Sequence, residues 1–278
     1  HTLLDSLQHI CLMHGMEVDY YKKLFQTIGN IIELIEKDDI PKYLLFLENA
    51  FPYMDNYNYH KGMNGIIQEL KCLLKTKSIG TDSDRALLLD FQATLETKPE
   101  KAIKLEKDAL AQIENITADN ARLVSNLHAN LGGLYRMNGH PDLAREHMEK
   151  SISLLDQFNL LHINDSIPQI ANYAMFLTEQ QEPERGISEL QKLSGIIKEY
   201  HSDDCLDYAK VQETLGTIYL MTANLPQAKT HFKRAFKIYE KIWADEPEMI
   251  EAKYQEIQEL YPQIGFCIGK NLSGLLTK

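Results

Sequence analysis

Cysteine is scarce in this sequence, with four residues in 278, and Cys11, Cys72, Cys205 and Cys267 lie far apart. No Cys-x-x-Cys pair and no histidine at zinc-finger spacing accompanies them. This excludes a metal knuckle and a small disulfide-held scaffold, so we expect reduced and mostly buried thiols. The sequence predicts no metal and no cofactor.

Long apolar runs and an excess of basic residues are also lacking. No apolar run approaches 18 residues, and polar side chains interrupt the first stretch, which argues against a membrane span and a signal peptide. The sequence has 29 Lys and Arg against 40 Asp and Glu, giving a net charge of −11 without a local basic patch. Such a field repels nucleic acid and anionic membranes. We therefore expect a cytoplasmic protein that binds neither directly.

Motifs of known enzyme classes are absent. The sequence has no G-x-S-x-G and no Rossmann glycine pattern, and the glycines of residues 265–270 are one residue too close for a phosphate-binding loop. The histidines at positions 128, 140, 147 and 231 show no metal-site spacing, so we interpret them as ordinary surface or interface residues. We predict that the protein is not an enzyme.

Helical periodicity runs through almost the whole chain, and long alternating β-branched stretches are missing. The fold class predicted is all-α. We expect helices at about 2–14, 17–37, 41–52, 60–76, 82–96, 99–115, 120–138, 141–158, 166–180, 183–200, 206–222, 225–242, 246–260 and 262–276. Proline in the first turn of several of them, after a short polar turn, indicates that they pair as antiparallel hairpins.

Three stretches repeat at a fixed step of 42 residues, which is the mark of a solenoid. They are Leu131-Gly132-x-x-Tyr135, Tyr173-Ala174-x-x-Leu177 and Leu215-Gly216-x-x-Tyr219, followed at one offset by Ala144, Gly186 and Ala228. Small residues at these places predict close approach of the two helices of each pair. Met148, Leu190 and Phe232, with Ser151, Leu193 and Ala235, extend a stripe that we interpret as core.

These residues resemble the tetratricopeptide repeat, in which Leu-Gly-x-x-Tyr on one helix precedes Ala-x-x-x-Phe-x-x-Ala on the next. The match is complete at Leu215, Gly216, Tyr219, Ala228, Phe232 and Ala235. A 42-residue unit is similar to the variant found in kinesin light chains and many bacterial proteins. The resemblance implies a right-handed superhelical solenoid of antiparallel helix pairs.

We expect one solenoid over residues 1–278. Residues 1–80 form non-consensus N-terminal helices, residues 82–249 form four 42-residue repeats, the first of them degraded, and residues 250–278 form C-terminal capping helices. The chain begins at His1 without Met, so we also expect that it is a piece of a longer protein.

The resemblance also implies a binding wall, because the first helix of each pair lines the concave groove in such arrays. Asn130 and Asn172 then form an amide ladder able to hold an extended peptide, and methionines supply an adaptable apolar floor. Arg136 and Lys210 are candidates for meeting a carboxylate. The alternatives are solvated amides or cations and core methionines. The predicted peptide-binding set is Asn126, Asn130, Arg136, Met137, Asn172, Met175, Lys210, Thr214 and Met221.

The function predicted is a scaffold that holds a peptide or protein segment in its groove. Two alternatives stay open. One is the ligand-sensing C-terminal half of a bacterial helix-turn-helix transcription regulator, motivated by the start at His1 and the non-consensus first 80 residues. The other is an assembly module that forms a homodimer or docks a large partner through its convex face or end helices, with residues 262–276 either forming that contact or capping the array.

Overall fold

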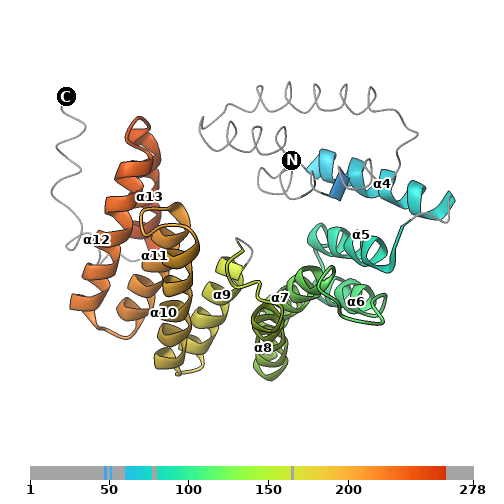
Figure 1. Ribbon diagram of the computed structural model, residues 1–278, viewed down its shortest axis with the longest axis horizontal. Helices are drawn as coiled ribbons and strands as arrows, with labels where there is room; N and C mark the ends of the chain where they lie inside the picture. The colour runs from blue at the N-terminus through green and yellow to red at the C-terminus, as the bar shows by residue number, and fades with distance from the viewer. Residues whose placement is uncertain (1–46, 49–50, 52–59, 77–79, 164–165, 261–278) are drawn as a thin grey trace. The chain divides into compact units, whose positions relative to one another are not determined.

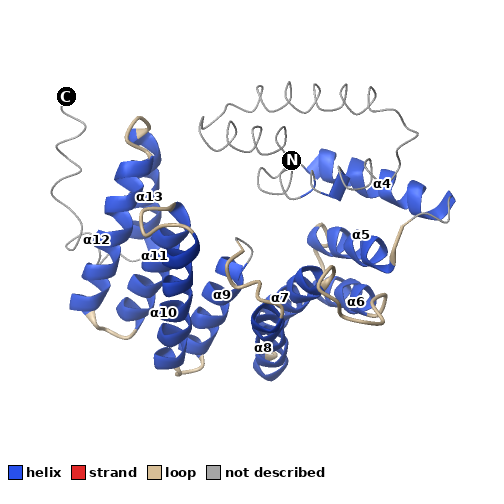
Figure 2. Cartoon of the chain, in the orientation of Figure 1, coloured by secondary structure: helices blue, strands red, loops and turns tan. Residues whose placement is uncertain are grey.

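The computed structural model describes residues 47–48, 51, 60–76, 80–163 and 166–260. Every regular element within these ranges is an α-helix, and the helices carry the labels α4 to α13 (Figures 1 and 2). The all-α prediction is therefore confirmed. The helices expected at 2–14, 17–37 and 262–276, and most of 41–52, lie outside the described residues. The chain divides after Asn115 into two compact units, which we describe separately.

The first unit contains α4 (His60–Thr76), α5 (Asp82–Thr94) and α6 (Pro99–Leu110). Its core forms where apolar residues of α4 at helical spacing pack against Phe91 of α5. The ring of Phe51 stacks on Phe91 with 3.8 Å between centroids. Among the described residues, this apolar cluster joins α4 to α5, and α6 packs against the same α5 helix.

The start of α5 is fixed by a reciprocal cap between Thr81 and Asp84. The Thr81 hydroxyl accepts from the Asp84 backbone N–H at 3.3 Å, and the Asp84 carboxylate accepts from the Thr81 N–H. Burial, followed by a hydrogen bond with Asp84, raises the pKa of Glu48 to about 8. Glu48 is therefore largely protonated near neutral pH, and its Oε1 is buried without a hydrogen-bond partner among the described residues.

The α6 helix is shorter than the sequence predicts, because it ends at Leu110 and not near residue 115. Beyond its end the chain tightens into i to i+3 turns, with Gln112 N–H donating to Ala109 C=O and Ile113 N–H to Leu110 C=O, both at 3.1 Å. The polar and β-branched residues that follow favour this exit from the helix.

Within the described residues of the second unit, up to residue 260, the chain forms three antiparallel helix pairs and a further helix. The pairs are α7 (Ala121–Met137) with α8 (Pro141–Gln157), α9 (Ser166–Glu179) with α10 (Pro183–Tyr200), and α11 (Leu206–Met221) with α12 (Leu225–Ile242), followed by α13 (Pro247–Leu260). The first helices lie side by side, since α9 contacts both α7 and α11. This is the stacking of a solenoid.

Close approach within each pair is confirmed at the small residues. A Cβ added at Gly132 meets Met148 Cγ at 2.6 Å, and one at Gly216 meets the Phe232 ring at 2.9 Å. At Gly186 a Cβ lies 2.6 Å from the backbone oxygen of Ala174. A larger side chain at Gly186 has to separate the helices, whereas at Gly132 and Gly216 it has to displace Met148 or Phe232, so the small residues set the spacing of each pair.

The turn inside each pair also repeats. Gly139, Gln181 and Ala223 occupy the same repeat position and all have positive φ, at 75°, 64° and 58°. The next residue closes a six-to-one hydrogen bond each time, as when His140 N–H donates to Tyr135 C=O at 2.9 Å. This is the Schellman ending of a helix, and it reverses the chain so that the second helix begins four residues after the last residue of the first.

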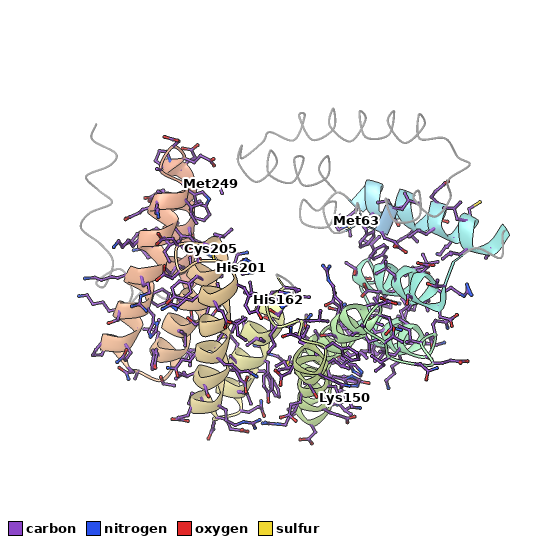
Figure 3. All side chains as sticks on the ribbon, viewed as in Figure 1. Met63, Lys150, His162, His201, Cys205 and Met249 are labelled. Atoms are coloured by element: carbon purple, nitrogen blue, oxygen red, sulfur yellow. The ribbon has the colours of Figure 1, made fainter. Side chains whose placement is uncertain are left out.

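The connection between α10 and α11 carries Cys205, whose sulfur accepts from the Tyr208 N–H at 3.4 Å and so caps α11. Nearby, His201 Nε2 lies 3.0 Å from the carbonyl of His162 (Figure 3). The expectation of buried thiols is wrong for Cys72, which is exposed on α4, while Cys205 is half-buried. No helix among the described residues combines the length and the apolar character needed to cross a bilayer.

Candidate functional site

The surface of interest is the outward side of α7, α9 and α11, which we call the first-helix face. Leu131, Tyr173 and Leu215 are buried on the inward side of these helices. The residues that directly precede them, Asn130, Asn172 and Thr214, are turned away from that core by the helical rotation. The nine predicted peptide-binding residues all lie on these three helices.

Two amides hold equivalent places on neighbouring helices of this face. Asn130 on α7 and Asn172 on α9 directly precede the buried residue of each repeat, and both are exposed. Since α7 and α9 are in contact, the two carboxamides project from adjacent helices of the same wall. Each carboxamide provides one acceptor and two donor hydrogens, which is the set needed to pair with a peptide group.

Asn126 has a partner inside the protein. Its Oδ1 accepts from Gln169 Nε2 at 2.6 Å, and the Gln169 Oε1 accepts from the hydroxyls of Ser125 at 2.9 Å and Ser151 at 2.6 Å. Ser125 and Ser151 are buried. The network joins α7, α8 and α9, so this end of the predicted set serves to fix one repeat on the next.

Arg136 meets a carboxylate of its own chain. Its Nε donates to Glu179 Oε2 at 2.8 Å, and its Nη2 contacts the other oxygen, which makes a two-point ion pair between α7 and α9. Lys210 lies 3.9 Å from Asp207, and the Thr214 hydroxyl donates to the Lys210 carbonyl at 3.0 Å. Both predicted cations of the face thus have a carboxylate within the chain.

The three methionines of the predicted set divide into two kinds. Met137 and Met221 occupy the same repeat position, and their side chains are 83% and 44% exposed. Met175 is half-buried and packs against the core cluster of the second unit. The apolar part of the face is therefore Met137 and Met221, at the ends of α7 and α11.

Helix α13 contacts α11 through the carboxylate of Glu213, which also binds a side chain of α12. Glu213 accepts from the Tyr239 hydroxyl at 2.6 Å and pairs with Lys253 of α13 at 2.9 Å. Burial lowers the pKa of Lys253, but Glu213 and then Glu256 outweigh burial and leave the pKa raised. Lys253 therefore stays charged in a half-buried place and ties α13 to the last repeat.

Two paired contacts were missed from the sequence. His128 and His147 approach with their Nδ1 atoms 2.9 Å apart, and His231 Nδ1 lies 2.9 Å from Gln212 Oε1 at the same repeat positions. In both repeats a tyrosine stacks on the second-helix histidine, Tyr135 at 5.4 Å and Tyr219 at 5.2 Å. The available signal was the spacing, since His147 and His231 lie two repeat lengths apart.

The environment of His128 disfavours its charged form. Burial, followed by the positive charges of His147 and Lys150, lowers the pKa of His128 to about 4 against an opposing effect of Glu146. The imidazole is neutral at pH 7. The interpretation of His128, His147 and His231 as ordinary surface or interface residues thus understates their role, because they link the two helices of a pair.

A family model for the tetratricopeptide repeat matches residues 166–241, which span α9 to α12. Residues 166–241 carry tetratricopeptide repeats. Repeats of this kind provide extended surfaces that bind other proteins, so the chain is a protein-interaction scaffold. No curated protein matches the sequence.

Solved structures with such repeats share the fold. One is a crystal structure of nearly identical TPR-like repeats from a putative kinesin light chain of Podosopora anserina. Its sequence is 12% identical, the match covers 73% of this chain and 98% of that chain, and the TM-score is 0.56. Another is BtubC (BKLC) from P. vanneervenii, with 16% identity, coverage of 82% and 85%, and a TM-score of 0.53. The predicted likeness to kinesin-light-chain repeats is therefore confirmed at the level of the fold.

Proposed function

We propose that the first-helix face binds an extended peptide segment of a protein partner. The observation that carries this proposal is the pair of exposed carboxamides, Asn130 and Asn172, at equivalent positions on two helices in contact. Side-chain amides at such a spacing hold the backbone of a peptide whatever its sequence. The peptide would run across α7 and α9 toward α11.

The apolar anchors of the ligand would meet the exposed methionines. Met137 and Met221 expose thioether side chains that adapt to ligands of different shape. Exposed methionine on a binding surface gains favourable contact area when a partner covers it. We therefore expect ligands with apolar side chains near the two amide contacts.

Charge contributes little to recognition in this proposal. The carboxylate of Glu179 already neutralises Arg136, and Lys210 lies close to Asp207. A ligand carboxylate would have to displace these partners, and exchange between exposed ion pairs yields little free energy. The selected peptides should accordingly be apolar and uncharged, not acidic.

The test is selection from a displayed library of random linear peptides against the full chain. A double variant, Asn130→Leu with Asn172→Leu, should bind the enriched peptides at least about tenfold more weakly, because two charge-free hydrogen-bond contacts are lost. The matched control is Gln157→Leu with Gln227→Leu, which removes two exposed amides from the second helices α8 and α12. Equal binding by both double variants would refute the amide ladder.

The sensor role and the assembly role remain alternatives. Among the described residues, no contact or site distinguishes either of them from a scaffold, and helix 262–276, which motivated the assembly role, lies outside those residues. The peptide-binding proposal has the specific support of the two amides.

A further inference from the structure

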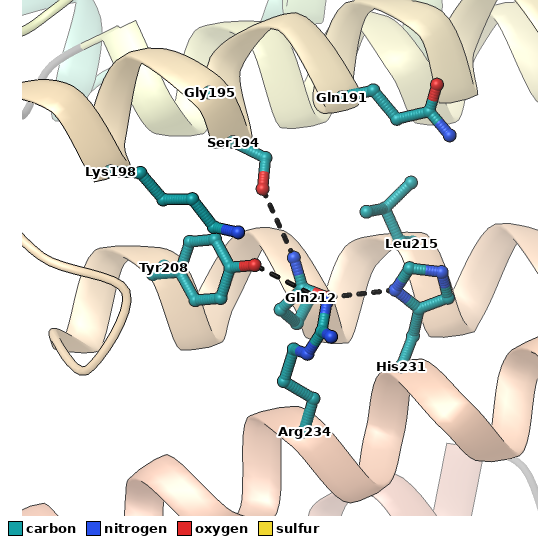
Figure 4. A pocket seen from close by; sticks show the side chains of 9 residues that line it. All are labelled: Gln191, Ser194, Gly195, Lys198, Tyr208, Gln212, Leu215, His231 and Arg234. Carbon is teal, nitrogen blue, oxygen red and sulfur yellow. Dashed lines mark hydrogen bonds between the residues drawn. The ribbon is translucent and has the colours of Figure 1, made fainter.

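A second site lies in the second unit, away from the first-helix face. A cavity of about 320 Å³ opens between α10, α11 and α12 (Figure 4). Its residues come from all three helices: Gln191, Ser194, Gly195 and Lys198 from α10, Tyr208, Gln212 and Leu215 from α11, and His231 and Arg234 from α12. We call it the α10–α12 pocket.

The pocket and the first-helix face occupy opposite sides of α11. Tyr208, Gln212 and Leu215 follow one another at spacings of four and three residues, which places them on one side of the helix. Lys210 and Thr214 fall between them in sequence and therefore point the other way. A ligand in the pocket would not compete for the surface proposed to bind peptides.

The lining carries two positive charges and no carboxylate. Lys198 and Arg234 point toward Tyr208 from opposite walls (Figure 4), with the Lys198 ammonium 5.2 Å from the Tyr208 ring centroid and Arg234 Nη1 3.5 Å from its hydroxyl. Neither cation forms an ion pair within the described part of the chain. Both side chains are exposed, and what distinguishes them from other cations of α10 and α12 is that they approach one tyrosine from two helices.

Three polar side chains of the pocket form a hydrogen-bonded chain. His231 Nδ1 donates to Gln212 Oε1 at 2.9 Å, and Gln212 Nε2 donates to Ser194 Oγ at 3.3 Å. Gln212 is 1% exposed and has both ends of its amide engaged. Because the Ser194 oxygen accepts, its own hydrogen is available to a ligand. Burial, and then Arg234, lowers the pKa of His231, so the positive field of the pocket is felt by the ring.

We propose that the α10–α12 pocket binds a small organic oxyanion, a phosphate monoester or a carboxylate, between Lys198 and Arg234. The anion would accept from the guanidinium, the ammonium and the Ser194 hydroxyl. The uncharged part of the ligand would lie against Tyr208 and Leu215. A volume of this size suits a small molecule and not a strand of a partner protein.

Gly195 provides a way to close the site without disturbing the fold. A Cβ added there meets no atom within 4 Å, although the residue lies on the pocket wall in the middle of α10. Gly195→Phe should therefore fill the cavity while keeping the helix, and Gly195→Ala should leave the pocket open. Lys229→Gln is the matched charge control, because it removes an exposed cation of α12 outside the pocket.

The experiment is calorimetric titration of the full chain with phenyl phosphate, inorganic phosphate, benzoate and phenol at constant ionic strength. Phenyl phosphate or benzoate should bind saturably with one molecule per chain, and more tightly than phenol. Lys198→Gln and Arg234→Gln should each weaken binding about tenfold, Gly195→Phe should abolish it, and Gly195→Ala and Lys229→Gln should leave it unchanged. Circular dichroism verifies that each variant is folded.

The outcomes separate the parts of the proposal. Preference for phenyl phosphate identifies a phosphate monoester, and preference for benzoate identifies a carboxylate. Equal affinity for phenol, or full binding by folded Gly195→Phe, overturns the site. Equal affinity for inorganic phosphate and phenyl phosphate overturns the assignment of Tyr208 and Leu215 as the contact for the uncharged part. None of these results depends on the amide ladder of the first-helix face.

Discussion

Gly186 gives the most direct test of how the helix pairs are spaced. A Cβ at this position lies 2.6 Å from the Ala174 backbone oxygen and 3.2 Å from its carbonyl carbon and Cα. Backbone atoms of α9 cannot turn aside as a side chain can, so α9 and α10 have to move apart in Gly186→Ala. Overpacking of a core costs about 1–3 kcal/mol, and this contact belongs at the upper end of that range.

The same change also has a favourable part, because alanine is a better helix former than glycine by about 1 kcal/mol. Gly195 isolates that part, since it lies in the same helix and its added Cβ meets nothing within 4 Å. We expect Gly186→Ala to destabilise the chain by about 2 kcal/mol and Gly195→Ala to stabilise it by up to about 1 kcal/mol.

A second pair of variants, Gly132→Ala and Gly133→Ala, tests whether the loss of stability depends on the kind of atom that the added Cβ meets. Gly132→Ala meets Met148 Cγ at 2.6 Å, but this is part of a flexible side chain, while its contact with the Ala144 oxygen is 3.3 Å. Gly133→Ala next to it meets nothing within 4 Å. Stability should therefore rise in the order Gly186→Ala, Gly132→Ala, wild type, with Gly133→Ala above wild type.

The assay is urea unfolding followed by far-ultraviolet circular dichroism, comparing transition midpoints among the variants. Repeat arrays can unfold in more than one step, so the midpoint of each resolved transition is compared with the same transition of the wild type. The reasoning fails if Gly186→Ala is as stable as Gly195→Ala, since that result would mean that α9 and α10 are not in backbone contact at this point.

Five further substitutions test a histidine, two turns and two ion pairs. Because the folded pKa of His128 is about 4, below its ordinary value of 6.5, the free energy of unfolding is highest above pH 6.5 and falls as pH decreases toward 4. His128→Gln copies the residue at the equivalent position in the last repeat. In urea titrations this variant should lose about 1–2 kcal/mol less stability than the wild type between pH 7 and pH 5. Ala223→Gly should stabilise the chain and Gly139→Ala should destabilise it, each by about 1 kcal/mol, because both positions have positive φ. A change in melting temperature of the same sign for both variants would contradict this prediction. Lys253→Met should lower the free energy of unfolding by about 1–3 kcal/mol, because its ion pair with Glu213 is half-buried. Lys192→Met should lower it by under about 0.5 kcal/mol, because the ion pair of Lys192 with Asp156 is exposed. Equal losses of stability in urea unfolding would show that burial of the Lys253 ion pair has no effect.

Much of the fold follows from the sequence because close packing of two helices restricts which residue types can occupy the contact positions. Where the two helices of a pair pack closely, only glycine or alanine fits, and the fixed step of Gly132, Ala174 and Gly216 is enough to predict the pairs. The turn prolines locate most helix starts, because proline is favoured only in the first turn. The end of α6 is not predicted correctly, since no glycine or proline marks it.

The candidate site is harder to predict from the sequence, because the repeat period does not show which hydrogen-bond or ion-pair partners the polar side chains have. The 42-residue step shows which residues face the same direction, and it leads to the pair Asn130 and Asn172. It does not show whether a neighbouring repeat supplies a partner. The α10–α12 pocket is the extreme case, since its lining combines residues of three helices that have no common motif.

The contacts between repeats explain where such a prediction succeeds and where it needs correction. Gln169 is 43 residues from Asn126, and Glu179 is 43 residues from Arg136. A residue one full period away lies parallel to its equivalent, whereas one more residue along the helix rotates the side chain by about 100° into the gap between the two helices. Polar residues spaced by 43 should therefore be considered first as bonds between repeats, and those spaced by 42, such as Asn130 and Asn172, as a row presented to a ligand.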